Sequence, residues 1–443
     1  MLYYYVTFRD YGLWRASERE NAKIFRILLG GGALPIRNLE RTLTADNGEK
    51  SDSIKVVPNV LMVISDAFPS EYAKGPSLTC ELIADQISLR LPVSIVTVGY
   101  DRLRKIRMSQ SQLLPSEAEK KINRIFLTPG FKKYIELAAI LRINKGPIFL
   151  HCLFEYRLVL PALVLALLTG HRKLYHLPHG MLLDATFAKH KIRKKTVCLL
   201  LKWTFLGKYL THVVSSELEK QDVLEKIGHN QSVILIQQPA EVDSRFRPTS
   251  FRGRTLGSPL RICSIGRICR QKNLIFILET LRQIEFNIVL NIYGDIEDRV
   301  YFKSCVEFLR QLPNQIQVNF CGQLSRNNLL AEVANNDLMF LPTLGENHGH
   351  AILEALALGC PVLISNLCPW IDVTAKGAGW SYDLNDRKNF AAALRTAYHS
   401  GPDWAKMRQA AFNYFDEKRV LSKDKYVEML HGEIEPSASL DGP

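Results

Sequence analysis

Two carboxylates, Glu346 and Glu354, lie eight positions apart in a stretch whose residue types suit a ligand site. The polar loop GENHGH carries Glu346, and the segment AILEALAL, which is rich in strong helix formers, carries Glu354. The free backbone N–H groups at the start of such a helix suit a phosphate or a sugar hydroxyl. Carboxylates accept hydrogen bonds from pairs of hydroxyls instead. A ligand that has both phosphates and vicinal diols, such as a nucleotide sugar, would satisfy both kinds of group.

The elements around this loop predict where it lies. An apolar run ends at Pro342, and the helix after the loop ends at Gly359, where a left-handed C-cap is expected. The next segment, PVLIS, is typical of a short buried strand. The order strand, loop, helix, strand puts both carboxylates at the edge of an open α/β sheet, where such sheets bind ligands.

Two further groups of residues follow predicted strands. Gly266 and Arg267 end a strand and Lys272 opens the next helix, so two cations meet at a helix N-terminus, as a diphosphate clamp requires. The strand KLYHL ends in LPHGMLLD, which puts His179 at the carboxyl edge of that strand. A single histidine there is either a structural residue or part of the site.

The whole chain alternates short apolar strands with helical stretches, which predicts parallel sheets with helices on both faces. With 443 residues the chain is too long for one typical core, so we expect an α/β protein of two domains. The segment RFRPTSFRGRTLGSP has the composition of a linker. The predicted divisions are an N-terminal extension and linker (1–55), a first domain (56–245), an interdomain linker (246–259), a second domain (260–401) and C-terminal helices with a tail (402–443).

These motifs together resemble the retaining, nucleotide-sugar-dependent glycosyltransferases often called group 1 or family 4. The resemblance covers residues 58 to about 400 and rests mainly on GENHGHAILEALALGCPVL and on the His-Gly-Met-Leu pattern within Pro178–Leu182. It implies the GT-B fold, in which two Rossmann-like domains face each other across a cleft. The first domain would hold the acceptor and the second would hold most of the donor.

The resemblance also implies a role for each site residue. Glu354 would hold the ribose hydroxyls of the donor, while Glu346 and His179 would lie by the transferred sugar. Arg267 and Lys272 would neutralise the pyrophosphate. The predicted site comprises catalytic His179 and Glu346, and donor-binding Gly75, Gly266, Arg267, Lys272, Asn347, His348, Gly349, His350 and Glu354. Of these, His348 stands where the family usually has an aromatic residue.

The net charge of +13 and the pI near 9.2 point to an anionic partner, which could be nucleic acid, an acidic membrane surface or a phosphorylated ligand. The run KHKIRKK at 189–195 is either a solvated helix face or a patch for a membrane surface. The second interpretation draws on the resemblance, because acceptors in that family are often lipid-linked. We expect no nucleic-acid partner.

Metal ions and membrane spans are not expected. The nine cysteines stand singly, without metal-ligand spacing, and there is no Asp-x-Asp motif, so the cations of the clamp would replace a metal ion. The longest apolar runs fall short of the roughly 20 residues of a membrane span, and the first 20 residues have no signal-peptide pattern. We therefore expect a cytoplasmic protein that can also lie peripherally at the inner face of the membrane.

The predicted function is transfer, with retention, of a sugar from a nucleotide-diphosphate sugar to a saccharide or lipid-linked acceptor, in surface polysaccharide or glycan biosynthesis. Two alternatives stay open at this point. One is a nucleotide-sugar epimerase or phosphorylase of the same fold. The other is a basic protein that binds membranes or nucleic acid and does no chemistry.

Overall fold

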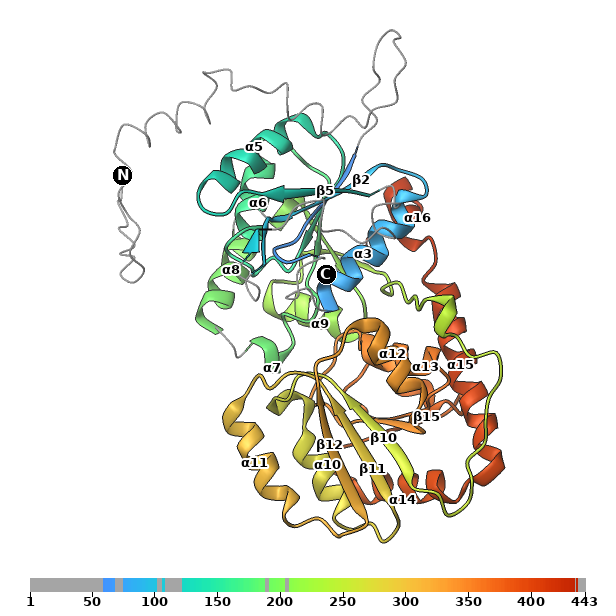
Figure 1. Cartoon of the computed structure of the whole chain (residues 1–443). Helices are drawn as coiled ribbons and strands as arrows, with labels where there is room; N and C mark the ends of the chain where they lie inside the picture. Colours follow the sequence, from blue (N-terminus) through green and yellow to red (C-terminus); the bar gives the residue numbers. More distant parts are fainter. Residues whose placement is uncertain are drawn as a thin grey trace, which may run out of the picture.

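Short apolar segments of the chain form two parallel sheets, one in each of two lobes that lie one above the other in Figure 1. The computed structural model describes residues 59–67, 75–101, 106–107, 122–187, 191–203, 207–434 and 436. Most central strands of both sheets are buried along their whole length, which is what helices on both faces of a parallel sheet require. The expected α/β class with two Rossmann-like domains is therefore confirmed.

The first lobe contains a seven-stranded sheet in the order β5-β2-β1-β6-β7-β8-β9. Its strands are β1 (Val60–Val63), β2 (Val93–Val98), β5 (Ile122–Leu127), β6 (Ile148–His151), β7 (Leu174–Leu177), β8 (Leu210–Val214) and β9 (Ser232–Leu235), with a small separate pair formed by β3 (Tyr100–Asp101) and β4 (Ile106–Arg107). Its helices are α3 (Gly75–Ser88), α5 (Lys132–Ile143), α6 (Val159–Leu168), α7 (Asp184–Phe187), α8 (Lys191–Trp203) and α9 (Glu217–Lys226). The strand order reverses direction between β1 and β6, so the switch point of this sheet lies between them.

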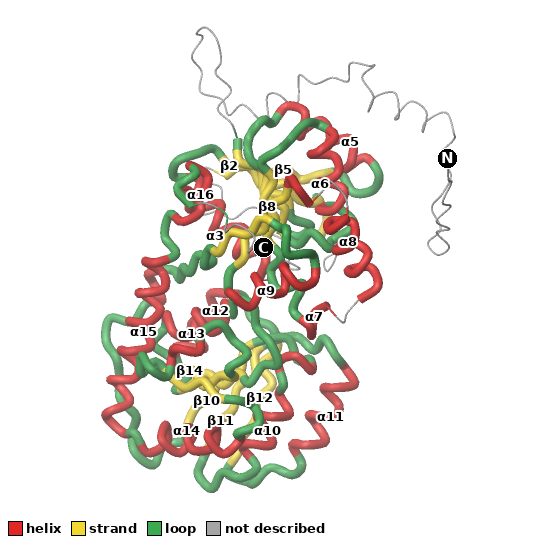
Figure 2. Tube along the Cα trace, turned by 180° about the vertical axis from the view of Figure 1, so that it is seen from behind, coloured by secondary structure: helices red, strands yellow, loops and turns green. Residues whose placement is uncertain are grey.

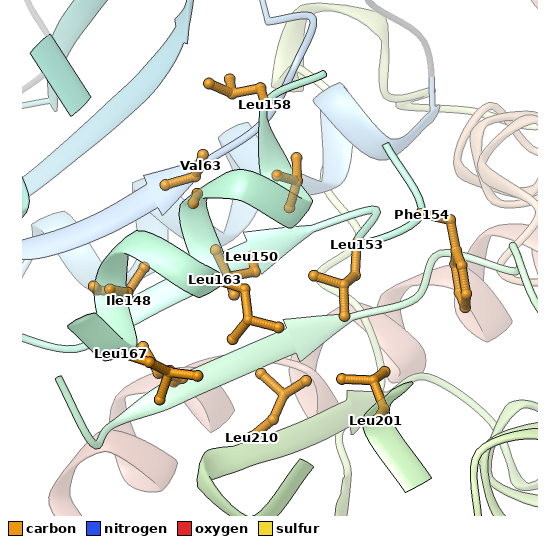
Figure 3. Packing of buried hydrophobic residues seen from close by; sticks show 14 of the residues in the cluster. Val63, Ile148, Leu150, Leu153, Phe154, Leu158, Leu163, Leu167, Leu201 and Leu210 are labelled. Atoms are coloured by element: carbon orange, nitrogen blue, oxygen red, sulfur yellow. The ribbon is translucent and has the colours of Figure 1, made fainter. Parts of the chain in front are cut away.

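One face of the first sheet is packed by leucine-rich helices (Figure 3). Leu150 of β6, Leu163 of α6 and Leu201 of α8 are all buried in this layer. Burying a side chain of this size removes enough apolar surface to contribute about 1.5–3 kcal/mol. This packing fixes the carboxyl ends of β6 and β7 relative to each other.

The second lobe contains a six-stranded sheet in the order β12-β11-β10-β13-β14-β15. Its strands are β10 (Leu260–Ile265), β11 (Ile288–Tyr293), β12 (Ile316–Gly322), β13 (Leu338–Leu341), β14 (Val362–Ser365) and β15 (Gly379–Tyr382). Its helices are α10 (Leu274–Leu281), α11 (Arg299–Leu309), α12 (Arg326–Ala334), α13 (His350–Ala357), α14 (Arg387–His399) and α15 (Trp404–Leu421). The strand order reverses between β10 and β13, so the loops after these two strands flank the switch point.

The last helices connect the two lobes (Figures 1 and 2). Helix α15 packs on α13 in the second lobe, whereas α16 (Lys425–His431) packs on α3 in the first lobe. Tyr426 and Met429 of α16 are buried in the core of the first lobe, and Gln86 Nε2 of α3 donates to the Ser422 carbonyl at 3.0 Å. Helix α16 thus belongs to the first lobe, although it follows the whole second lobe in the sequence.

The chain passes from the first lobe to the second just before Ala240. Ile236 lies in the core of the first lobe, whereas Ala240 and Val242 lie in the core of the second. The segment 246–259, which the sequence suggests as a linker, runs along the second lobe, where Arg254 pairs with Asp337. In the part of the chain that the structure describes, no helix combines the length and apolar character needed to cross a membrane.

Candidate active site

A cavity of about 460 Å³ lies between the lobes at the carboxyl ends of both sheets. It is lined by every predicted site residue except Glu354: Gly75 and His179 from the first lobe, and Gly266, Arg267, Lys272, Glu346, Asn347, His348, Gly349 and His350 from the second. Gly75 opens α3 and lies against His350, whose Cδ2 would be 3.6 Å from an added Cβ. Residues from distant parts of the sequence therefore converge on one cavity.

On the second lobe, Lys272 and Glu346 form an ion pair across the switch point. Lys272 Nζ lies 2.5 Å from Glu346 Oε2, and both side chains are 18% exposed. Gly266 leaves room for this lysine because it has no Cβ: an added Cβ would come within 2.9 Å of Lys272 Cε. Its φ of +145° also favours glycine. A larger residue at 266 would therefore displace the lysine.

Arg267 points to a different carboxylate. Its guanidinium pairs with Glu297, which follows β11, and its side chain is 42% exposed. Arg267 and Lys272 both line the cavity, so two cations face it while each is neutralised by its own acid. An incoming dianion can compete for both cations.

Glu354 lies beside the cavity rather than in its lining. Its Oε1 accepts a hydrogen bond from Arg326 Nε at 2.8 Å, and Arg326 Nη2 also donates to the Glu241 carbonyl at 3.0 Å. Burial raises the pKa of Glu354, and the positive charge of Arg326 opposes that rise. Sequence reasoning did not single out Arg326, which ties this acid to the segment that joins the lobes.

His179 is held in a tight left-handed turn at the end of β7. Its φ is +52° and that of Gly180 is +70°, a conformation that costs free energy at a non-glycine residue. His179 Nε2 lies 2.9 Å from His151 Nδ1, and the two rings stack. Burial lowers the pKa of His179 well below its usual value and that of His151 to about 3, so both imidazoles are neutral at pH 7.

A buried carboxylate, Glu219 of α9, supports this turn. Its Oε1 accepts from the Gly180 N–H at 2.7 Å, and its Oε2 accepts from the N–H and hydroxyl of Ser215 at 2.9 and 3.0 Å. Burial raises the pKa of Glu219. The sequence does not reveal this role of Glu219, because Ser216 and Glu219 have the Ser-x-x-Glu spacing of an ordinary helix capping box.

The same carboxylate meets the loop before α13 in the second lobe. With its side-chain amide turned to match these partners, Asn347 donates to Glu219 Oε1 at 3.2 Å and accepts from Gly180 N at 3.3 Å. An added Cβ at Gly180 would lie 2.7 Å from Asn347 Cβ. Gly180 is therefore needed both for its backbone conformation and for the close approach of the lobes.

A second bridge between the lobes runs through Thr79. Its hydroxyl lies 2.7 Å from His350 Nε2 and 2.9 Å from Gln238 Oε1, and Gln238 Nε2 lies 3.4 Å from His179 Nδ1. Burial is the main reason that the pKa of His350 is lowered to about 4. The neighbouring His348 is buried, and its carbonyl accepts from Trp370 Nε1 at 2.5 Å. These contacts fix the loop before α13.

The residues of this cavity can be compared with known proteins. A profile of the family described as "Glycosyl transferases group 1" matches residues 248–414, which contain the cations and acids of the second lobe. Residues 248–414 thus form a group 1 glycosyltransferase domain. The expected resemblance to this family is thereby confirmed.

Two curated proteins are similar to this chain. It is 25% identical over 260 residues to the Escherichia coli "UDP-Gal:alpha-D-GlcNAc-diphosphoundecaprenol alpha-1,3-galactosyltransferase", with 52% of this chain and 61% of the relative covered. It is 22% identical over 187 residues to the Staphylococcus aureus "Capsular polysaccharide biosynthesis glycosyltransferase CapM", with 41% and 48% covered. The chain therefore spans less than two thirds of either relative's length.

The fold is also found in solved structures. HepE of Anabaena in complex with UDP-glucose superposes with a TM-score of 0.65 at 14% identity, with 85% of this chain and all of that chain covered. At this identity the likeness shows the fold alone. It agrees with the two parallel sheets and the cleft between them.

The basic segment at 189–195 differs from what the sequence predicts. Lys194 does not face solvent, because it is buried and its Nζ donates to the carbonyls of Met181 and Thr186, both at 2.8 Å. The prediction that it belongs to a surface patch is therefore wrong. Lys189 lies outside the described residues. Lys191, Arg193 and Lys195 are exposed.

Exposed apolar side chains lie on the same helix as these cations. They are Ile192 (84% exposed), Leu199 (57%), Leu200 (44%) and Trp203 (76%). Among the described residues, no group of three or more His, Cys, Asp or Glu side chains is arranged to hold a metal ion.

Proposed function

We propose that the protein transfers a sugar, with retention of its anomeric configuration, from a nucleoside-diphosphate sugar to a saccharide or lipid-linked acceptor in polysaccharide or glycan biosynthesis. The observation that carries the proposal is the convergence of Arg267 and Lys272 on a cavity that His179 closes from the other lobe. The named activities of the curated relatives and the UDP-glucose in HepE support the same class of donor.

The charges of the cavity fit the charge that develops during transfer. When the bond between sugar and phosphate breaks, negative charge grows on the leaving diphosphate and positive charge on the sugar. Arg267 and Lys272 stabilise the diphosphate, and Glu346, released from part of its pairing with Lys272, stays close to the sugar. Neutral His179 exchanges hydrogen bonds with sugar hydroxyls without adding a charge. Glu354 accepts from the ribose hydroxyls.

The first test measures donor binding and product configuration. The protein is titrated with UDP-, GDP-, ADP- and dTDP-sugars while its thermal unfolding is followed. A ligand at a hundred times its dissociation constant stabilises by about 2.7 kcal/mol, which a thermal shift detects. Proton NMR of the product then reads its anomeric configuration. Stabilisation by none of the nucleotide sugars contradicts the proposal, and conversion of the donor without any acceptor indicates an epimerase.

The transfer proceeds without a divalent metal in this proposal, because the two cations take the place of one at the diphosphate. Activity should survive treatment with EDTA. Loss of activity with EDTA that magnesium or manganese restores would show that the two cations do not suffice.

The proposal includes peripheral contact of helix α8 with an anionic membrane, at its inner face if the protein is cytoplasmic. Its supports are the exposed cations Lys191, Arg193, Lys195 and Lys202 and the exposed apolar Ile192, Leu199, Leu200 and Trp203. Each cation near an anionic surface contributes about 1 kcal/mol, and apolar side chains that enter the interface add to this. Such a contact would bring a lipid-linked acceptor to the first lobe.

Vesicle sedimentation tests this contact. Binding to vesicles that contain anionic lipid should fall when Ile192 and Trp203 are changed to serine, and fall further when Lys191, Arg193 and Lys195 are changed to glutamine. Lys303→Gln with Arg310→Gln, exposed cations of the second lobe, is the matched control. Equal binding of all variants would rule out α8 as the contact.

A further inference from the structure

Gln238 lies where the chain leaves the first lobe, between Ile236 in the core of that lobe and Ala240 in the core of the second. It is 4% exposed, and it lines the cavity that contains His179. Burying a side-chain amide costs free energy unless both its N–H and its C=O groups find partners. The partners of Gln238 therefore indicate what this side chain does.

The Gln238 amide has a different partner at each end. Its Oε1 accepts a hydrogen bond from the Thr79 hydroxyl at 2.9 Å, and its Nε2 lies 3.4 Å from His179 Nδ1. A side-chain amide donates only through its nitrogen and accepts only through its oxygen. His179 Nδ1 is therefore the acceptor of this contact, and the proton of the neutral His179 ring is on Nε2.

The neighbouring contacts extend this arrangement into a row that crosses between the lobes. On one side, His179 Nε2 donates to His151 Nδ1 at 2.9 Å. On the other side, the single hydroxyl proton of Thr79 is used for Gln238, so His350 Nε2, which lies 2.7 Å away, donates to the Thr79 oxygen. Every donor in the row thus points from the second lobe towards His151.

The two ring nitrogens of His179 are held unequally. Nε2 makes the shorter contact, 2.9 Å to a ring that also stacks on it, whereas Nδ1 makes the longer contact of 3.4 Å. His151 is fully buried, but His179 is only partly buried and lines the cavity. A sugar hydroxyl can therefore replace the weaker contact at Nδ1, where it meets an acceptor.

We propose that Gln238 is a positioning residue that sets the tautomer of His179, so that His179 accepts a hydrogen bond from a hydroxyl of the bound sugar rather than donating one. The proposal rests on the glycosyltransferase function proposed above, because it assigns a direction to the contact between His179 and the sugar. Thr79 holds the Gln238 amide in the required orientation, and His350 adds a contact that forms only when the lobes are close together.

The tautomer of His179 can be measured in the full chain at pH 7. Two-bond proton–nitrogen correlation spectra of protein labelled with ¹⁵N in its histidine rings distinguish a proton on Nε2 from one on Nδ1, and His179→Gln assigns the signals. We expect His179 and His151 each to carry the proton on Nε2. The reversed row, with the Gln238 amide turned over and both protons on Nδ1, would leave an acceptor instead of an N–H at the buried His151 Nε2. That result, or a mixture of the two tautomers, overturns the proposal.

Gln238→Glu tests whether the amide sets this tautomer. A carboxylate only accepts hydrogen bonds, so it requires a proton on His179 Nδ1. The His179 signals should therefore change to the Nδ1–H form or to the imidazolium. Gln231→Glu is the matched control, because Gln231 is also buried and also bonded to a histidine, His212, outside the cavity. His179 signals that keep the Nε2–H form in Gln238→Glu overturn the proposal.

Two substitutions of Thr79 test the effect on transfer. Thr79→Val removes the hydroxyl that holds the Gln238 amide, so kcat should fall about tenfold, with a smaller change in the donor's KM. Thr79→Ser keeps the hydroxyl and should restore most of kcat. Thr280→Val, which changes a buried helical threonine outside the cavity, is the control. A role in packing alone predicts the opposite order, because valine keeps the shape of threonine. That order, or an unchanged kcat in Thr79→Val, overturns the proposal.

Nucleotide binding separates this proposal from the one on which it rests. UDP affinity is measured by calorimetry on the same samples of the wild type and of Thr79→Val. Failure of UDP and all other nucleotides to bind removes the glycosyltransferase function and, with it, the role of Gln238 in transfer. Normal UDP binding together with His179 in the Nδ1–H form removes only the role of Gln238.

Discussion

On the second-lobe wall of the cavity that contains His179, the charged side chains Arg267, Lys272 and Glu346 are paired, whereas the side chains that line the first-lobe wall of this cavity are neutral. Lys272, which follows β10, is paired with Glu346 in the loop after β13. Opposite them, burial keeps His179 and His151 neutral, and Glu219 directs its carboxylate to backbone N–H groups beneath the turn. The two walls therefore contribute different kinds of interaction.

The second-lobe wall thus stabilises charge in the transition state, whereas the first-lobe wall positions the substrate. Charges preorganised in a cleft act strongly on a transition state because they need not reorient when the reaction occurs. Pairing each cation with an acid keeps it compensated before the donor arrives, which avoids a buried unpaired charge. Neutral groups on the other wall can orient hydroxyls without disturbing that balance. Changes to the second wall should thus affect turnover most, and changes to the first wall should act through geometry.

The largest effect is expected for Lys272→Ala. Loss of one preorganised charge contact costs about a hundredfold to a thousandfold in rate, and the loss should appear in kcat more than in the donor's KM. Arg267→Ala should behave similarly, and Lys303→Ala, an exposed lysine of α11, is the control. Initial rates over a range of donor concentrations give both constants. Full turnover with only a raised KM would make these cations ground-state anchors.

Glu354→Ala should come next and should act on donor binding. A hydrogen bond to a charged group contributes about 1.5–3 kcal/mol, so UDP affinity should fall roughly tenfold to a hundredfold. Calorimetry with UDP measures this, with Glu307→Ala as an exposed control on α11. An unchanged affinity would remove Glu354 from the donor site.

Glu219→Gln tests whether the first wall acts through position. The amide keeps the size of the side chain but cannot accept from Gly180 and Ser215 with both of its ends, so the His179 turn should loosen. We expect kcat to fall about tenfold, the equivalent of one hydrogen bond, with little change in UDP affinity. Glu217→Gln on the same helix is the control. A fall in UDP affinity as large as that of Glu354→Ala would break the proposed division between the walls.

The smallest effect concerns acid stability of the first lobe. Burial lowers the pKa of His212 to about 4, and its ring faces His176 Nδ1 at 2.9 Å and Gln231 Oε1 at 3.2 Å. In the unfolded chain the pKa of histidine is near 6.5. Protonation of His212 therefore does not reduce the free energy of unfolding above that pH, but it reduces this free energy as pH falls from 6.5 towards 4. The raised pKa of Glu219 acts in the opposite direction.

His212→Gln should therefore flatten the dependence of stability on pH. Between pH 6 and pH 5 the variant should lose about 1 kcal/mol less unfolding free energy than the wild type. Urea unfolding at both pH values measures this difference. Parallel losses in the two proteins would show that His212 does not carry a protonation cost.

Much of the second wall could be predicted because its signals are local. Glu346, Lys272 and Arg267 each stand a few residues after a strand that periodicity reveals, and parallel strands bring their carboxyl ends together. The strand, loop, helix, strand order around Glu346 is also local, and the structure has it as β13, loop, α13 and β14.

The first wall could not be predicted in the same way because its partners are distant in sequence. Glu219 meets Gly180 across 39 positions, and Thr79 meets His350 across 271. Lys194 looks like a surface cation by composition, but the carbonyls that bind it appear only when α8 packs against the turn after His179. The contacts of Glu219 and Lys194 depend on how the first lobe packs, and that of Thr79 depends on how the two lobes close; no local pattern encodes either.

Because α16 completes the core of the first lobe, the order in which the chain is synthesised affects how that lobe folds. Tyr426 and Met429 fill the core of the lobe that emerges first from the ribosome, next to Phe149 and α3. That lobe is incomplete until the last helix has been made, so its apolar surface stays open while the whole second lobe is translated. A chain that ends after α15 would leave this surface exposed permanently, and the damage would appear in the lobe farthest from the truncation along the chain.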